Sequence, residues 1–335
     1  MNRVARFASA VVVCLLTASC ATFTLRPYSA AGHGTPFQEW APHASSAEWW
    51  YVTGVLHDTA GGLWLYQFTI FHRARALTQG YLVDLSLTDY ATGQHIFDES
   101  ATTDMSTVQG SDSTIAVGNE AIDMTPRGGA VTAEAEDLSF HFGLIEEKAP
   151  VWHGNEGVIP MGAPVSPDHM SYYYSLTDLA TSGTVTFVDQ MGRTRSEHLS
   201  GSSWVDRQWG RFTDSAWDWF SLRLFAGSEI MLFAFPSGER LGTIVSDEGR
   251  VTHLADFEYQ TTDWITIGSS RYGQAWTVKL PESGRFYTIR SLSASAYNPN
   301  RVLPYWEGLC GVYDHRGRLI GYAVEETTAT AHPAS

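Results

Sequence analysis

Four short blocks of the sequence place carboxylic acids beside aromatic side chains. The acids are Glu48 (HASSAEWWY), Glu156 (WHGNEG), Asp206 (WVDRQWG) and Glu307 (YWEG). Packing against indole rings disfavours the charged form of a carboxyl group, so its pKa rises and it stays protonated near neutral pH. Such a group is a general acid, and nearby Trp faces stabilise a carbocation. The chemistry these blocks suit is protonation of an alkene, with capture of the cation by water or by a second π-bond.

Each block also has an ordinary structural explanation. An aromatic residue beside an acid often marks a core strand that ends in a hydrogen-bonded surface carboxylate. Glu48 could simply accept backbone N–H bonds or pair with an arginine, and Asp206 could pair with Arg207 next to it. Four such blocks in one chain favour a site, but their spacing alone does not show that they converge.

The candidate ligand-binding residues come from three of these blocks and from the SYYYS stretch at 171–175. The set is Trp49, Trp50, Tyr51, Tyr172, Tyr174, Trp204, Gln208, Trp209, Trp306 and Glu307. Among them, Trp49, Trp204 and Trp209 would shape a pocket and stabilise positive charge. Tyr51 and Gln208 would orient the acid or a water molecule. Aromatic residues are 13% of the chain and 12 residues are Trp, which suits a cavity for an apolar ligand.

Alternation along a strand divides these residues between two faces. Trp49 and Tyr51 share one face of the AEWWYVTG stretch, and Glu48 and Trp50 share the other. In the same way, SYYYS at 171–175 predicts a strand that places Tyr172 and Tyr174 together and Tyr173 on the opposite side.

Motifs for other chemistries are missing from the sequence. There is no GxSxG nucleophile elbow, no P-loop and no GxGxxG segment. The histidines are scattered and no CxxC pair occurs, so we expect neither a metal site nor a cofactor.

Short alternating runs indicate an all-β protein. They lie at 63–72, 81–90, 184–190, 219–225 and 229–235, and turn sequences such as TAGG and SDEG separate them. A closing hairpin is expected over 306–326. Regular short strands with tight turns are typical of antiparallel sandwiches and barrels.

The run of strands suggests two domains. We place the N-terminal domain at 41–200 and the C-terminal domain at 201–328, because the Trp-dense stretch 201–219 follows a complete set of strands. A tether at 21–40 would precede them and a polar tail at 329–335 would follow.

Residues 1–20 have the pattern of an export signal. Arg3 and Arg6 form a basic start, and the apolar run after them is too short to span a membrane. It ends in LLTASC, as bacterial lipoprotein signals do, although Thr17 stands where leucine is usual. We expect cleavage before Cys20 and lipidation of its thiol, which would anchor the protein on the periplasmic side of a bacterial membrane. A plain secretory signal with an incidental cysteine is the alternative.

The net charge limits the classes of binding partner that we expect, and the cysteine content limits the disulfides that the chain can form. Loss of the two signal arginines takes the formal charge from -15 to -17, which argues against nucleic acid and anionic membrane surfaces. Only Cys310 remains after residue 20, so an intramolecular disulfide is excluded.

Seven blocks occur in a characteristic order between about residues 43 and 324: AEWWYVTG, LYQFTIFH, VWHGNEG, MSYYYSLTDLATSG, WVDRQWG, WDWFSLRL and YWEG. With this combination the chain resembles the lipocalin-like family that includes the carotenoid 1,2-hydratases and the AttH-like proteins. The resemblance implies two lipocalin-like antiparallel β-barrels packed together.

The hydratases of that family add water across the terminal double bond of an acyclic carotenoid, without a cofactor. The resemblance implies that their acid corresponds to Asp206 and an aromatic partner to Trp204. They also have a His and a Trp upstream, where this chain has SYYYS. That departure, and the EWWY and DRQWG forms, point to the AttH-like branch rather than to carotenoid hydration itself.

Two hypotheses follow for an exported lipocalin-like protein with a hydrophobic, isoprenoid or polyene ligand. In the first it is a cofactor-free hydratase, isomerase or cyclase, with Asp206 or Glu48 as the proton donor. In the second it is a periplasmic carrier without turnover. The expected partners are the ligand, the membrane through Cys20 and, as a further candidate, a membrane transport complex.

Overall fold

The computed structural model describes residues 26–27, 34–75, 78–162, 165–166, 168–212, 216–281 and 283–328. The expected signal peptide, Cys20 and the tail at 329–335 lie outside the described residues. Two short 3-10 helices occur, η1 (Pro36–Glu39) and η2 (Met105–Thr107). No helix in the described part of the chain is long and apolar enough to cross a membrane.

The first sheet has thirteen strands. They are β3 (Ala47–His57), β4 (Leu63–Arg75), β5 (Thr78–Asp89), β6 (Gln94–Thr102), β7 (Val108–Gly110), β8 (Thr114–Val117), β9 (Glu120–Thr125), β10 (Gly128–Glu134), β11 (Leu138–Glu146), β12 (Val151–Trp152), β13 (Val158–Pro160), β14 (Met170–Val188) and β15 (Thr194–Arg211). Their order is β6-β5-β4-β3-β15-β14-β11-β10-β9-β8-β7, and β12 and β13 pair with β14. The sheet is antiparallel and curls around its own core.

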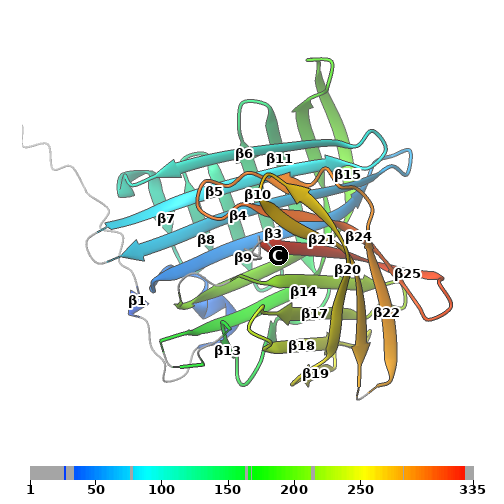
Figure 1. Cartoon of the computed structure of the whole chain (residues 1–335). Coiled ribbons are helices and arrows are strands. Elements are labelled where there is room, and N and C mark those ends of the chain that lie inside the picture. Colours follow the sequence, from blue (N-terminus) through cyan, green and yellow to red (C-terminus); the bar gives the residue numbers. More distant parts are fainter. Residues whose placement is uncertain are drawn as a thin grey trace, which may run out of the picture.

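The second sheet has ten strands. They are β16 (Asp218–Leu224), β17 (Glu229–Ala234), β18 (Arg240–Val245), β19 (Val251–Leu254), β20 (Glu258–Ile267), β21 (Ser270–Leu280), β22 (Arg285–Ser291), β23 (Tyr297–Asn298), β24 (Tyr305–Tyr313) and β25 (Leu319–Thr328). Their order is β19-β18-β17-β16-β25-β24-β22-β21-β20, and β23 pairs with β24. A separate parallel pair joins β1 (Arg26–Pro27) to β2 (His43–Ala44). Figure 1 shows the first sheet in blue to green and the second in yellow-green to red.

Alternation along the central strands supplies two different cores. In β3, Trp50 and Val52 enter the core inside the first sheet, whereas Trp49 and Tyr51 face the second sheet. Tyr173 of β14 likewise leaves its neighbours and joins a core between the two sheets. Residues of both sheets form this interface core, so its apolar surface is buried only when the sheets pack together.

The structure confirms the all-β prediction of two curled antiparallel sheets, and the hairpin expected over 306–326 is the β24–β25 pair. The division at residues 200 and 201 falls inside β15, which belongs wholly to the first sheet. The chain changes sheet after Arg211, because the Trp-dense stretch is itself a central strand followed by a connection.

The end of the expected tether at 21–40 is also part of the fold. Residues 36–39 form η1, and Trp40 is fully buried. The backbone carbonyl of Trp40 accepts a 2.8 Å hydrogen bond from the indole of Trp50, which fixes this segment against the first sheet.

Candidate functional site

Three adjacent strands bring the site together. β15 lies between β3 and β14, and Asp206 stands directly opposite Tyr51 on one side and Ser175 on the other. One register step further, Gln208 stands between Trp49 and Tyr173. Facing residues on neighbouring strands have close side chains, so this register builds one polar and aromatic cluster on the face that the second sheet covers.

The carboxyl group of Asp206 is the centre of this cluster and is 4% exposed. Its Oδ2 accepts a hydrogen bond from the Tyr173 hydroxyl at 2.7 Å. Its Oδ1 accepts from the Trp204 indole at 2.6 Å and from the Ser175 hydroxyl. The Tyr173 oxygen in turn accepts from the indole of Trp219 in the second sheet at 2.9 Å. The carboxyl is therefore held in one orientation by groups from both sheets.

Burial decides the protonation of Asp206. Loss of solvation raises its pKa to about 7, against the opposing effect of the hydroxyl and indole donors that favour the anion. Near neutral pH the group therefore exists in both forms. This is the range in which a carboxyl group gives and takes protons efficiently.

The second sheet contributes two more acids to the same interface. Glu307 of β24 accepts a 2.7 Å hydrogen bond from the hydroxyl of Tyr51, and burial raises its pKa well above the usual range. Glu326 of β25 accepts from the indole of Trp217 at 2.6 Å. Burial, with the charge of Asp206 nearby, raises the pKa of Glu326 to about 7. Asp206 and Glu326, whose pKa values are both about 7, thus face the same interface.

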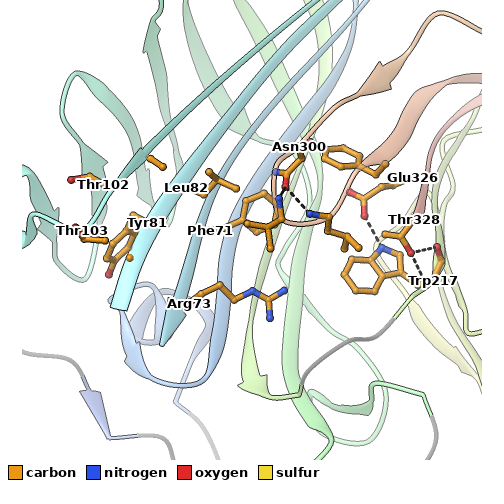
Figure 2. A pocket seen from close by; sticks show the side chains of 15 residues that line it. Phe71, Arg73, Tyr81, Leu82, Thr102, Thr103, Trp217, Asn300, Glu326 and Thr328 are labelled. Atoms are coloured by element: carbon orange, nitrogen blue, oxygen red, sulfur yellow. Dashed lines mark hydrogen bonds between the residues drawn. The ribbon is translucent and has the colours of Figure 1, made fainter. Parts of the chain in front are cut away.

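A cavity of about 370 Å³ opens between the sheets, with Glu326 in its lining. This volume lies within the roughly 300–1,000 Å³ of ordinary ligand pockets. Figure 2 shows its wall, in which Phe71, Tyr81 and Leu82 of the first sheet stand across from Trp217 and Glu326. The lining is mostly apolar. An apolar ligand therefore fits it better than a highly charged one.

A smaller chamber of about 30 Å³ lies deeper at the interface. Its lining residues are Trp49, Tyr51, Thr69, Phe71, Asp206, Gln208, Trp217, Trp219, Phe233 and Glu326. It shares Phe71, Trp217 and Glu326 with the larger cavity, so the two adjoin. The small chamber has room for one or two water molecules, or for the tip of a ligand whose body lies outside.

Glu48 does not lie in this site. It is fully buried inside the first sheet, where it pairs with Arg207 and accepts a 2.8 Å hydrogen bond from Nδ1 of His43. These partners hold the pKa of Glu48 well below its usual range in spite of burial. An acid that stays ionised cannot donate a proton near neutral pH, so the geometry removes Glu48 as a proton donor. The alternative of an arginine pair describes it correctly.

The remaining predicted residues divide between the site and the two sheet cores. Trp49, Tyr51 and Gln208 line the small chamber, Trp204 holds Asp206, and Glu307 holds Tyr51. The others lie elsewhere because strand alternation turns them away. Trp50, Tyr172, Tyr174 and Trp209 are in the core of the first sheet, and Trp306 is in the core of the second.

Several site residues were missed by the sequence reasoning. They are Thr69, Phe71, Tyr173, Ser175, Trp217, Trp219, Phe233 and Glu326. Alternation already put Tyr173 on the face opposite Tyr172 and Tyr174, so that signal was available. Glu326 had no local signal, because only the pairing of β25 with β16 and β24 brings it to the interface.

The sequence led us to expect no metal site, and such a site would need several His, Cys, Asp or Glu side chains close together. Within the described ranges, no three of them lie close enough to hold a metal ion. The acids of the site instead meet hydroxyl and indole donors.

A sequence profile described as AttH-like matches residues 35–328. The chain belongs to the AttH-like family. A structure described as an AttH protein of Nitrosomonas europaea has a TM-score of 0.79 at 23% identity, over 92% of this chain and 100% of that one. Kievitone hydratase of Nectria haematococca has a TM-score of 0.70 at 16% identity, over 92% and 96%. At these identities the likeness shows the fold, which is the lipocalin-like one expected. A comparison with curated protein sequences gives no match.

Proposed function

We propose that this AttH-like protein hydrates an alkene of an apolar, isoprenoid-type ligand held between its two sheets, with Asp206 as the proton donor. The observation that carries the proposal is the Asp206 carboxyl, whose pKa burial raises to about 7, in a chamber walled by aromatic rings and joined to an apolar cavity. An acid and a desolvated apolar pocket at one place are what protonation of an unactivated alkene needs.

The proposed reaction balances in three steps. The π-electrons of the alkene form a new C–H bond with the acidic proton of Asp206, which leaves a carboxylate on Asp206 and a positive charge on the neighbouring carbon. A lone pair of water forms the C–O bond to that carbon. The oxonium proton then passes to the carboxylate of Glu326, so the net change is addition of one water molecule.

Aromatic rings around the chamber would stabilise the cation. Trp49 and Trp217 stack with their ring centroids 5.9 Å apart, and Trp219 stands edge-on to Tyr51 at 5.4 Å. Ring faces attract positive charge, most strongly where water is excluded. Trp49 keeps the role predicted for it, while Trp217 and Trp219 take the place expected of Trp209.

The likeness to known proteins supports the reaction class only at the level of analogy. One structural neighbour is named a hydratase, kievitone hydratase. The WVDRQWG block that holds Asp206 resembles the acid-bearing block of the carotenoid 1,2-hydratases. A carotenoid is one member of the substrate class proposed here, and isomerisation or cyclisation would share the first protonation step.

The reaction is tested with isoprenoid alkenes in water enriched in heavy oxygen. We would incubate the protein with geraniol and with farnesol and analyse the products by mass spectrometry. Hydration predicts an alcohol that has gained one heavy oxygen atom from the solvent. An isomer or a cyclic product without solvent oxygen would show that the cation formed by this protonation loses a proton or closes a ring instead of capturing water. Unchanged alkenes would favour the carrier.

The pH profile should form a narrow bell with its maximum near pH 7. Asp206 must keep its proton, so kcat/KM falls as pH rises through its pKa of about 7. Glu326 must be ionised, so kcat/KM falls as pH drops through its pKa of about 7. Glu326→Gln should lower kcat by about 100-fold and remove the acid limb of the profile. An acid limb that stays in this variant would show that another group accepts the proton.

We also propose that the protein is exported and anchored by a lipid at Cys20, on the observation that LLTASC ends an apolar signal. Expressed in a bacterium, wild type should sediment with membranes, and Cys20→Ser should move to the soluble fraction because it lacks the acyl chains. Equal membrane association of both proteins would contradict the anchor.

A further inference from the structure

A continuous row of hydrogen-bonded side chains, which we call the file, leads from Asp206 to the surface at β19. Asp206 accepts from Ser175, and the Ser175 hydroxyl meets Nε2 of His153 at 2.6 Å. On its other side, Nδ1 of His153 meets the Thr243 hydroxyl at 2.9 Å. The same hydroxyl lies 3.3 Å from Nδ1 of His253, which is exposed. The file crosses from one sheet to the other and is separate from both cavities, whose lining residues include only its last member, Asp206.

The single proton of each hydroxyl fixes the direction of the file. Ser175 gives its proton to the Asp206 carboxylate, so it must accept from the N–H at Nε2 of His153. His153 then has a lone pair at Nδ1, which accepts from Thr243. Thr243 in turn accepts from an N–H at Nδ1 of His253. Every donor therefore points from the surface towards the buried acid.

We propose that this file is a proton path that reprotonates Asp206 from solvent after each turnover. The inference rests on the proposed role of Asp206 as a proton donor. The need for a path arises because Asp206 is 4% exposed and opens only into the chamber. A bound apolar ligand would close the chamber and leave the acid without access to water on that side.

The surroundings of His153 suit it to pass protons on. Its ring is fully buried, lies tilted against the ring of Tyr173 at a centroid distance of 4.2 Å and has hydroxyl partners at both nitrogens. Burial, with the charge of His253 beyond Thr243, lowers the pKa of His153 to about 3. The ring is therefore neutral at working pH and keeps one donor and one acceptor nitrogen.

The transfers balance over one turnover. One proton enters at His253 and hops through Thr243, His153 and Ser175, each group receiving one proton and releasing another, until the Asp206 carboxylate is neutral. The proton that water released to Glu326 leaves through the larger cavity. The path also gives a role to the WHGNEG block, in which Glu156 is exposed and His153 is the residue that reaches the site.

The path is tested by infrared spectroscopy with a saturated alcohol, 1-dodecanol, bound in the cavity, because this probe closes the chamber and offers no alkene to protonate. On transfer below pH 7 from ordinary to heavy water, the C=O band of protonated Asp206 shifts as its proton is replaced by deuterium, and Asp206→Asn identifies the band. Thr243→Val removes the linking hydroxyl with little change of shape, and Thr243→Ser keeps it. We expect exchange about tenfold slower in Thr243→Val, which corresponds to a barrier higher by about 1.4 kcal/mol, and a nearly normal rate in Thr243→Ser.

A second variant avoids any change in the interior. His253→Ala alters an exposed residue, should slow the exchange similarly, and should recover its rate when imidazole is added as a soluble proton donor. Exchange at the wild-type rate in both Thr243→Val and His253→Ala would overturn the path. If exchange slows in these variants while wild type hydrates no alkene, the proposed function fails and the path stands.

Discussion

Asp206→Asn should abolish turnover and leave the fold and ligand binding intact. Asparagine has nearly the same shape as aspartate, and its amide oxygen still accepts from Trp204 and Ser175, while its amide nitrogen can donate to the Tyr173 oxygen. Only the acidic proton is lost. Removal of a general acid costs about 100- to 10,000-fold in rate. The measurement is kcat on an alkene that wild type converts, with ligand affinity determined on the same preparations.

The same variant should change how stability depends on pH. Burial raises the pKa of Asp206 from 3.8 to about 7, so between these values the folded chain keeps a proton that the unfolded chain has lost. The free energy of unfolding of wild type therefore falls as pH rises from 3.8 to about 7 through this group. Asp206→Asn should lack that part of the fall. A variant that unfolds, or that turns over at the wild-type rate, would contradict the assignment.

Glu48→Gln should be among the most destabilising single changes in the chain. Arg207 lies fully buried between the rings of Trp50 and Trp209, at 4.0 Å and 5.0 Å from their centroids, and Glu48 is its only carboxylate partner among the described residues. Removing one member of a buried ion pair leaves an uncompensated charge, at a cost of about 3–5 kcal/mol. Denaturant unfolding of wild type and variant near neutral pH measures this loss.

The pH dependence of the Glu48 contribution has the opposite sign to that of Asp206. Because its partners hold the pKa of Glu48 below the ordinary 4.5, its stabilisation is present above pH 4.5 and lost as the pH falls below that value. In Glu48→Gln this acid-dependent loss should be smaller. The two variants together give a crossed result: Asp206→Asn folds without turnover, and the folded fraction of Glu48→Gln turns over normally. A loss below about 1 kcal/mol in Glu48→Gln would contradict the buried pair.

Period-two alternation made the faces of single strands predictable. Trp49 and Tyr51 do share a face, and Glu48 and Trp50 share the other, as the sequence indicated. Alternation is a local property of extended backbone, so it needs no knowledge of the partner strand. It did not say which face meets the second sheet, and for that reason Trp50 and Glu48 were placed in the site.

Register and long-range pairing were beyond the sequence. Nothing local shows that Asp206 stands opposite Ser175 and Tyr51, or that Glu326 arrives from the last strand. The neighbours Asp206 and Arg207 suggested an ion pair, yet they point to opposite faces, and Arg207 pairs with Glu48, which is 159 residues away. Side chains adjacent in sequence on a strand rarely meet, whereas side chains on paired strands do.

The most direct test of the central claim uses the ligand that the protein binds in the cells that produce it. The ligand would be extracted from the purified protein, identified by mass spectrometry, and incubated afresh with wild type and with Asp206→Asn. We predict an alkene that wild type converts to its hydrate while Asp206→Asn binds it and returns it unchanged. Recovery of the same unaltered molecule from both proteins would contradict catalysis and establish a carrier.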